Sequence, residues 1–95
     1  MRRAAKVDDN QKQIVKALRL VGASVEVLSA VGKGCPDILV GFRGQNYLME
    51  IKDGSKYKSQ QRLTPDQVVW HNEWRGKVNI ANSVDQALLI IGVKV

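Results

Sequence analysis

Residues 34–52 have the sequence GCPDILVGFRGQNYLMEIK and decide the fold that we expect. Two apolar runs flank Arg43-Gly44, a pattern that is typical of a β-hairpin with a two-residue turn. If Arg43-Gly44 forms the turn, Phe42 faces Gln45, and Asp37 lies directly opposite Glu50. Residues that face each other across a hairpin share one side of the sheet. The spacing therefore predicts two carboxylates on one side of a single hairpin.

The same face of the hairpin carries a lysine. Lys52 is two residues beyond Glu50, so its side chain points in the same direction. Carboxylates that face each other repel, and a cation between them removes the repulsion. A hard ion such as Mg²⁺ takes one or two carboxylates together with waters. A Pro-Asp turn and a solvated Glu-x-Lys strand face are the alternative, and a slip by one residue separates the groups.

Length and composition place limits on the chain. With 95 residues, 44% of them hydrophobic, we expect one domain over residues 1–95 with a modest core. No apolar window reaches membrane-spanning length, and the basic first residues lack the apolar centre of a signal peptide. Cys35 is the single cysteine, which excludes an internal disulfide and favours a reducing cytoplasm. Residues 1–7 are expected to form a flexible basic arm.

The charge balance favours a polyanionic partner. The net charge is +6, from 15 Lys and Arg against 9 Asp and Glu. Such an excess suits nucleic acid, with an acidic membrane surface as the competing partner. The candidate phosphate contacts lie in the loops on either side of the hairpin, and they are Lys33, Lys56, Lys58 and Arg62. An ordinary solvated loop surface is the alternative for each of them.

The order of predicted elements is helix, strand, strand, strand, helix, strand, helix. Outside the hairpin, the helices are expected over Asp8–Val21, Thr64–Arg75 and Ser83–Ile91, and the strands over Ala23–Leu28 and Lys77–Ala81. The segment between the third and fourth strands is long enough for a crossover connection. We therefore expect an α/β (α+β) fold, a mixed sheet flanked by helices.

The helix after residue 64 has a well-defined start. Thr64 and Gln67 have the spacing of a capping box, and Gln67 has a second candidate role in orienting a group near the carboxylates. Trp70 and Trp74 share a helix face with Gln67, and we expect them to pack in the core. His71, the single histidine, is expected to be exposed and without a role, with general-base chemistry as the alternative.

These residues carry a resemblance to a known family. Pro36-Asp37 followed by Glu50-Ile51-Lys52 resembles the PD-(D/E)XK nuclease motif, and the element order is similar to the restriction-endonuclease-like core of that superfamily. Within the superfamily, residues 34–39 and 67–70 resemble VRR-NUC domains. These domains are compact nucleases found in phage and bacterial proteins, and they also occur at the ends of larger repair enzymes. The stand-alone members are similar to Holliday junction resolvases in size and layout. The resemblance covers residues 8–91.

The resemblance implies a metal-dependent phosphodiesterase. Asp37, Glu50 and the backbone carbonyl of Ile51 would bind Mg²⁺ or Mn²⁺. Lys52 would orient the attacking water or stabilise charge on the phosphorane, and Gln67 would contact Lys52 or the phosphate. The implied activity is structure-selective cleavage of DNA, at four-way junctions and by a homodimer, in the cytoplasm of a bacterial or phage-infected cell. A non-catalytic nucleic-acid-binding module is the alternative, and a subunit that docks a partner protein is a third hypothesis.

One position departs from the family pattern. Many members carry a glutamate on the first helix that faces the metal. By its spacing to Ile14, Gln11 occupies the corresponding position here. Asp8, Asp9 and Asn10 remain open as substitutes, and so does the choice between one metal ion and two. The sequence does not choose among branched and linear DNA substrates.

Overall fold

The computed structural model describes residues 8–95, and the arm predicted over residues 1–7 lies outside this range. A four-stranded sheet forms its centre, in the order β1 (Ser24–Val27), β2 (Ile38–Phe42), β3 (Gln45–Ile51), β4 (Val78–Ala81). The first three strands are antiparallel, whereas β4 runs parallel to β3. The predicted mixed sheet and the predicted order of elements are confirmed. In the described part of the chain, no helix has the length and apolar character needed to cross a membrane.

The hairpin of β2 and β3 has the predicted register. Phe42 pairs with Gln45, and Ile38 pairs with Met49. Arg43 and Gly44 form the turn with φ of 50° and 77°, as a two-residue turn that matches the strand twist requires. The paired residues begin at Ile38, and just before them the Asp37 N–H donates to the Met49 carbonyl at 3.0 Å. This bond departs by one residue from the register of the hairpin, and it keeps Asp37 beside β3, close to Glu50.

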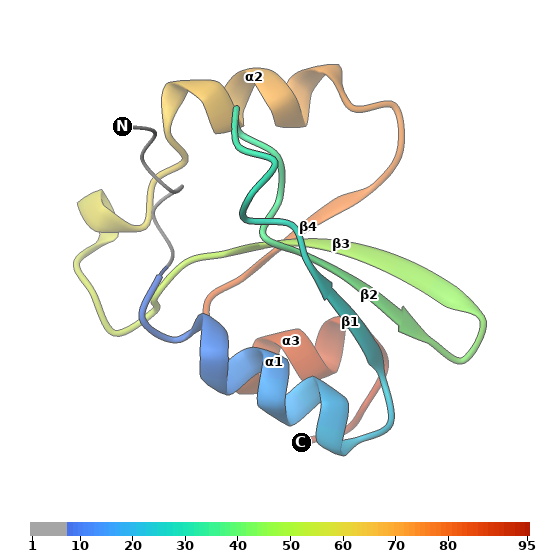
Figure 1. Ribbon diagram of the computed structural model, residues 1–95. Helices are drawn as coiled ribbons and strands as arrows, with labels where there is room; N and C mark the ends of the chain where they lie inside the picture. Colours follow the sequence, from blue (N-terminus) through green and yellow to red (C-terminus); the bar gives the residue numbers. More distant parts are fainter. Residues whose placement is uncertain (1–7) are drawn as a thin grey trace.

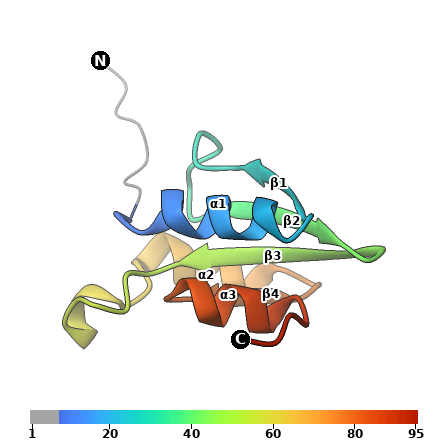
Figure 2. The same ribbon diagram turned by 90° about the horizontal axis from the view of Figure 1, so that it is seen from below.

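The helices lie on the two faces of the sheet (Figure 1). α1 (Gln11–Leu20) and α3 (Val84–Ile90) cover one face, and α2 (Pro65–Glu73) crosses the other. Figure 2 shows α1 and α3 together in front of the strands, with α2 behind them. The core lies between the sheet and the α1/α3 pair. Its completely buried side chains include Ile14, Leu18, Val40, Met49 and Ile51. α2 has no buried residue.

All three helices are shorter than predicted. α1 begins at Gln11 instead of Asp8. Asn10 occupies the cap position but makes no capping bond, because its amide donates to the Lys52 carbonyl at 3.1 Å. α3 begins after Ser83, whose hydroxyl accepts from the Gln86 N–H at 3.1 Å, whereas the Gln86 side chain accepts from Asn82 instead of closing a capping box.

The prediction that the tryptophans pack in the core is wrong. α2 ends at Glu73, and Trp74 already has an extended conformation, so the helical spacing does not apply to it. The Trp74 residue is 47% exposed. Its ring stacks on Trp70, with 4.7 Å between the ring centroids and 18° between the planes. The two rings pack against each other on the α2 side of the sheet, away from the main core.

A close backbone contact holds the start of α2. Gly34 has a φ of 80°, in the region that side chains disfavour. An added Cβ at this position would overlap the carbonyl oxygen of Asp66 and lie 2.8 Å from the Gln67 nitrogen. The glycine thus permits the loop before β2 to touch the first turn of α2.

Gly34→Ala is expected to destabilise the protein far more than Gly32→Ala. Gly32 has a similar φ of 71°, but an added Cβ there meets no atom within 4 Å. The conformational cost at Gly32 is about 1 kcal/mol. The overlap at Gly34 raises the cost to about 3 kcal/mol or more. Urea unfolding of both variants measures the difference, and equal losses of stability would contradict this account of the loop.

Candidate functional site

Asp37 is fixed by the strands on both sides of it. Its carbonyl accepts from the Leu28 N–H at 2.7 Å, next to β1. Its side chain is buried, and Oδ2 accepts from the Ile51 N–H of β3 at 2.6 Å. A backbone donor on this carboxylate sets the direction of the side chain and leaves Oδ1 for another partner. These bonds place Asp37 beside β3 at the end of the hairpin.

Glu50 lies on β3, on the side of the sheet that α2 covers. The residue is only 1% exposed. Its Oε2 accepts from the Gln67 side-chain amide at 3.0 Å, whereas Oε1 has no hydrogen-bond partner. A buried carboxyl oxygen without a partner is costly, and such an atom is a marker for an additional ligand.

The protonation of Glu50 reflects these surroundings. Burial raises the pKa of the Glu50 carboxyl, and the neighbouring Asp37 carboxyl raises it further, to about 9, although the Lys52 ammonium acts in the opposite direction. At neutral pH this raised pKa favours the protonated form of the Glu50 carboxyl. The two carboxyl groups are close enough that a second negative charge is disfavoured unless another cation joins Lys52.

Lys52 and Gln67 connect β3 to α2. The Lys52 side chain is buried, and its ammonium donates to Gln67 Oε1 at 2.8 Å. The same oxygen accepts from the Thr64 N–H at 2.9 Å and completes the capping box. Gln67 therefore has both of the roles considered for it: it caps α2, and it contacts Lys52 and Glu50. The side chains of Asp37, Glu50, Lys52 and Gln67 converge on one place.

The start of α1 contributes one acid to this place. Burial raises the pKa of Asp8, Lys52 lowers it, and Asp37 raises it, which puts Asp8 within electrostatic reach of both groups. Gln11 is buried elsewhere, and its amide donates to the Ser29 hydroxyl at 3.3 Å. Asp9 pairs with Lys56 at 3.3 Å. Of the first-helix candidates, Asp8 is the acid that interacts with the site.

The sequence predicts that His71 is exposed and without a role. The predicted exposure is wrong. The side chain is 12% exposed, and Nε2 lies 3.7 Å from Glu50 Oε1. Burial, followed by the Lys52 ammonium, lowers the pKa of His71, so the ring tends to be neutral. His71 follows Gln67 by four residues, which places both on one face of α2. This spacing could have revealed His71 once Gln67 was assigned to the site.

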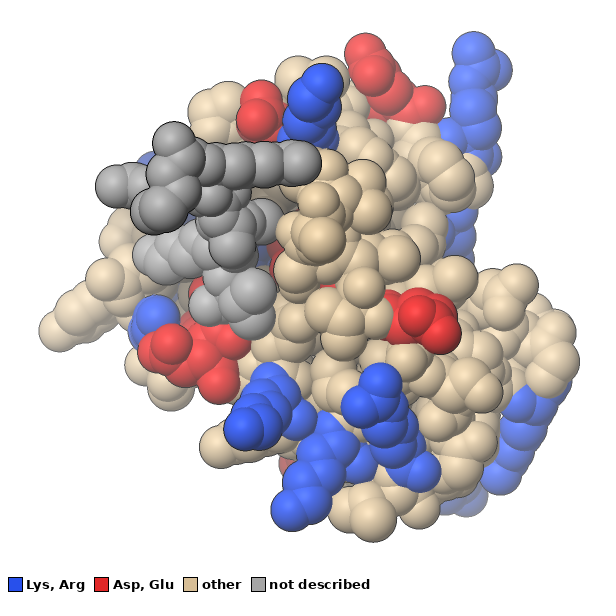
Figure 3. All heavy atoms as spheres, viewed as in Figure 1, with Lys and Arg blue, Asp and Glu red and all other residues tan. Residues whose placement is uncertain are grey.

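The predicted phosphate contacts lie around the site at the surface. Lys33, Lys58 and Arg62 are exposed, whereas Lys56 is partly covered and engaged with Asp9. Lys33 adjoins Gly34, the residue that touches α2, and Lys58 begins a single 3-10 turn, Lys58–Gln60. Figure 3 shows further Lys and Arg side chains over α1, where the exposed basic residues are Lys12, Lys16 and Arg19. Basic side chains thus occur on both sides of the sheet.

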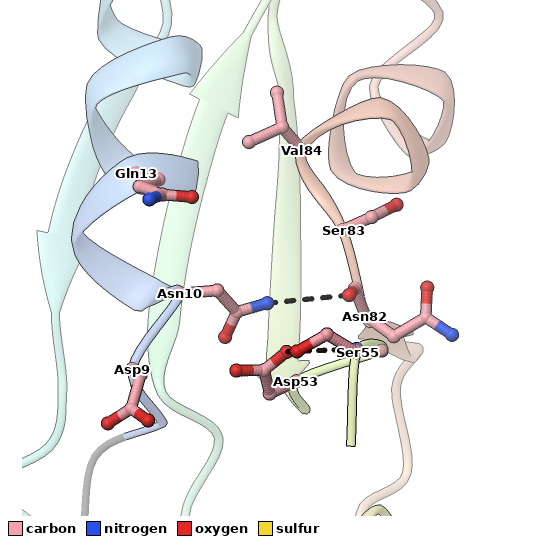
Figure 4. A pocket seen from close by; sticks show the side chains of 9 residues that line it. Asp9, Asn10, Gln13, Asp53, Ser55, Asn82, Ser83 and Val84 are labelled. Atoms are coloured by element: carbon pink, nitrogen blue, oxygen red, sulfur yellow. Dashed lines mark hydrogen bonds between the residues drawn. The ribbon is translucent and has the colours of Figure 1, made fainter. Parts of the chain in front are cut away.

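A polar pocket of about 500 Å³ lies between the start of α1 and the ends of β3 and β4. In Figure 4 the Asn10 side chain points across it to the Asn82 carbonyl, a contact of 3.4 Å. Its other lining residues include Asp9, Asp53 and Ser55. None of the converging side chains lines this pocket, so it is separate from the candidate site.

The donor set fits a hard cation that keeps most of its water. No group of three or more His, Cys, Asp and Glu side chains in residues 8–95 is arranged to hold a metal. Asp37 and Glu50 supply two carboxylates, and Glu50 Oε1 lacks a partner. Mg²⁺ is commonly held by one or two carboxylates plus waters and substrate phosphates. The residues therefore fit Mg²⁺ or a similar ion and do not form a closed protein cage.

In chelator, Glu50→Gln is expected to stabilise the protein as the pH rises. Between the ordinary pKa of 4.5 and about 9, the folded state binds more protons at Glu50 than the unfolded state, so wild-type stability falls with increasing pH. The Glu50→Gln variant has no ionisable group at this position, so it does not lose this stability as the pH rises. At pH 8 we expect its Tm to be higher by at least about 5 °C.

Thermal unfolding between pH 5 and pH 8.5 measures this difference. Glu26→Gln, at an exposed position of β1, is the control, and its Tm is expected to follow the wild type. A gap between Glu50→Gln and the wild type that does not widen with pH would contradict the assignment of a neutral, buried Glu50.

Comparison with known proteins identifies the fold. Neither a protein-family model nor a curated protein sequence matches the chain. A solved structure described as a VRR_NUC domain is similar to it, with a TM-score of 0.61 and 29% sequence identity. The match covers 85% of this chain and 88% of the other. The predicted VRR-NUC resemblance is thereby confirmed, and the chain is a nuclease-type domain with the VRR-NUC fold.

Proposed function

We propose that the chain is an endodeoxyribonuclease that hydrolyses phosphodiester bonds with the help of Mg²⁺ or Mn²⁺. The observation that carries this proposal is the buried convergence of Asp37, Glu50 and Lys52, joined by Gln67. Cleavage of a phosphodiester needs an anchored cation, a positioned water and positive charge near the phosphate. These side chains supply the anchors and the fixed positive charge.

Each protein group has a definable part in the reaction. Asp37, Glu50 and the Ile51 carbonyl would hold the cation, and the Ile51 N–H keeps the Asp37 carboxylate in place. A bound Mg²⁺ or Mn²⁺ supplies Lewis-acid chemistry at the scissile phosphate. The Lys52 ammonium, oriented by Gln67, would align the water or stabilise charge on the phosphorane. Because these side chains are buried, their charges act more strongly than in open water.

Asp8 is proposed as the acid that replaces the missing glutamate of the first helix. It interacts with Lys52 and Asp37, whereas Gln11 bonds to Ser29. A carboxylate at the start of α1 would act on the cation directly or through a water. With Asp8 the site would draw its acids from two separate parts of the chain, although the three carboxyl groups are not grouped as metal ligands in the described residues.

DNA is the proposed substrate, in branched form. The net charge of +6 and the exposed Lys33, Lys58 and Arg62 suit a polyanionic backbone. Symmetric incision of a four-way junction needs two active sites, which a two-fold homodimer would supply. The lone Cys35 suits a reducing cytoplasm.

Asp37→Asn and Lys52→Ala are each expected to reduce cleavage in Mg²⁺ or Mn²⁺ by at least about 10²-fold, because each removes a group that acts on the phosphate or its cation. DNA binding in chelator should change little. A panel of four-way junctions, flaps, forks and plain duplex measures both effects. The matched controls are Asp85→Asn and Lys94→Ala, at exposed positions of α3 and the chain end. Variants that cut as fast as the wild type would show that the site is elsewhere.

The double variant Lys58→Ala/Arg62→Ala is expected to bind DNA more weakly, and its affinity for DNA should depend less on the salt concentration. Each lost phosphate contact lowers the slope of log K against log salt by about 0.9. Fluorescence anisotropy in chelator, over a range of NaCl concentrations, measures the slope, with Lys94→Ala as the control. An unchanged slope would show that Lys58 and Arg62 do not contact the DNA phosphates.

A non-catalytic DNA-binding module is the second candidate. The neutral Gln11 at the position of the family glutamate favours it. It predicts that the wild type binds DNA in chelator yet leaves every member of the panel intact in Mg²⁺ and in Mn²⁺. Cleavage of any member that Asp37→Asn abolishes would exclude this alternative.

A further inference from the structure

His71 and Glu50 face each other across a short gap. Nε2 of His71 and Oε1 of Glu50 are 3.7 Å apart, and the side chains are 12% and 1% exposed. Neither atom has a hydrogen-bond partner among the described residues. Buried polar atoms are nearly always paired, so two unpaired atoms aimed at each other need an explanation.

α2 presents a potential donor to each oxygen of the Glu50 carboxyl. Gln67 Nε2 already donates to Oε2 at 3.0 Å. His71, one helical turn later, lies beside the remaining oxygen. Its ring packs edge-on against Trp70, with 6.1 Å between the ring centroids and 73° between the planes. Helix spacing and this packing together hold the ring close to Oε1.

The gap between His71 Nε2 and Glu50 Oε1 is slightly wider than a hydrogen bond. A separation of 3.7 Å is too long for a hydrogen bond. An ionised carboxylate attracts an N–H donor strongly. Hydrogen bonds at functional sites are often long without ligand and shorten when it binds.

We propose that His71 is a positioning residue for Glu50, with its Nε2–H donating to Oε1 when the carboxylate holds a cation. With Gln67 on Oε2, this bond fixes both the rotation of the carboxylate and the lone pairs that face the metal. The inference rests on the proposed function, since it requires a cation at Asp37 and Glu50. Outer partners of metal-bound side chains typically contribute 10–100-fold to metal affinity.

Direct Mn²⁺ binding tests this role without reference to cleavage. Isothermal titration calorimetry should show affinity about 10–100-fold weaker in His71→Leu, which fills the space but donates nothing. His71→Gln places an amide N–H near the position of Nε2, and we expect its affinity to lie within about threefold of the wild type. Asn72→Leu, on the exposed face of α2, is the control and should bind as the wild type does.

Two results separate the inference from the proposed function. A wild type that fails to bind Mn²⁺ would contradict the function itself. Normal binding by the wild type, with unchanged affinity in His71→Leu or no recovery in His71→Gln, would overturn only the role of His71. Thermal unfolding of each variant in chelator shows whether the fold is retained.

A spectroscopic measurement on the unaltered protein gives an independent answer. Because the chain has a single histidine, ¹⁵N-histidine labelling yields one set of ring signals. We expect a neutral ring with the proton on Nε2, and a downfield shift of that proton when Mg²⁺ is added. A proton on Nδ1, with Nε2 bare, would overturn the inference, because Nε2 could then not donate to Glu50.

Discussion

Two carboxyl groups, those of Asp37 and Glu50, are buried side by side in a small basic domain. They come together at the end of the β2–β3 hairpin, where Asp37 is hydrogen-bonded to Met49 and Ile51. Burial and the neighbouring Asp37 carboxyl raise the pKa of Glu50 to about 9. Such an arrangement is unfavourable as long as the second charge is uncompensated. A protein of 95 residues has limited stability to offset it. The unfavourable pair makes sense if a cation completes it, and the rest of the site is arranged around that requirement.

The position of α2 is the main structural consequence. This helix has no buried residue, so the hydrophobic core does not hold it. Its placement depends on polar and close backbone contacts: Gln67 with Lys52 and Glu50, and Asp66 against Gly34. The residues that orient the functional groups are therefore also those that hold the helix. A substitution at Gln67 would therefore disturb the placement of the helix as well as the site.

The sequence was most informative where local geometry determines the outcome. The two-residue turn and the alternation of strand faces were sufficient to predict the register of the hairpin, at the end of which Asp37 lies close to Glu50, and the Thr64–Gln67 spacing was sufficient to start α2. The failures concern how separate elements approach each other. Trp74 leaves the helix before its spacing takes effect, and Asn10 bonds to Lys52 instead of capping α1. The His71 side chain is only 12% exposed because α2 crosses the sheet at Glu50, a tertiary contact that no local pattern contains.

The most direct test of the account is the location of a bound ion. Crystals grown with Mn²⁺ and measured at the manganese absorption edge reveal the metal by its anomalous signal. A peak is expected between the Asp37 and Glu50 carboxylates, within coordinating distance of both. A peak confined to the separate pocket beside Asp9 and Asp53, or no peak in protein that cuts DNA with Mn²⁺, would contradict it.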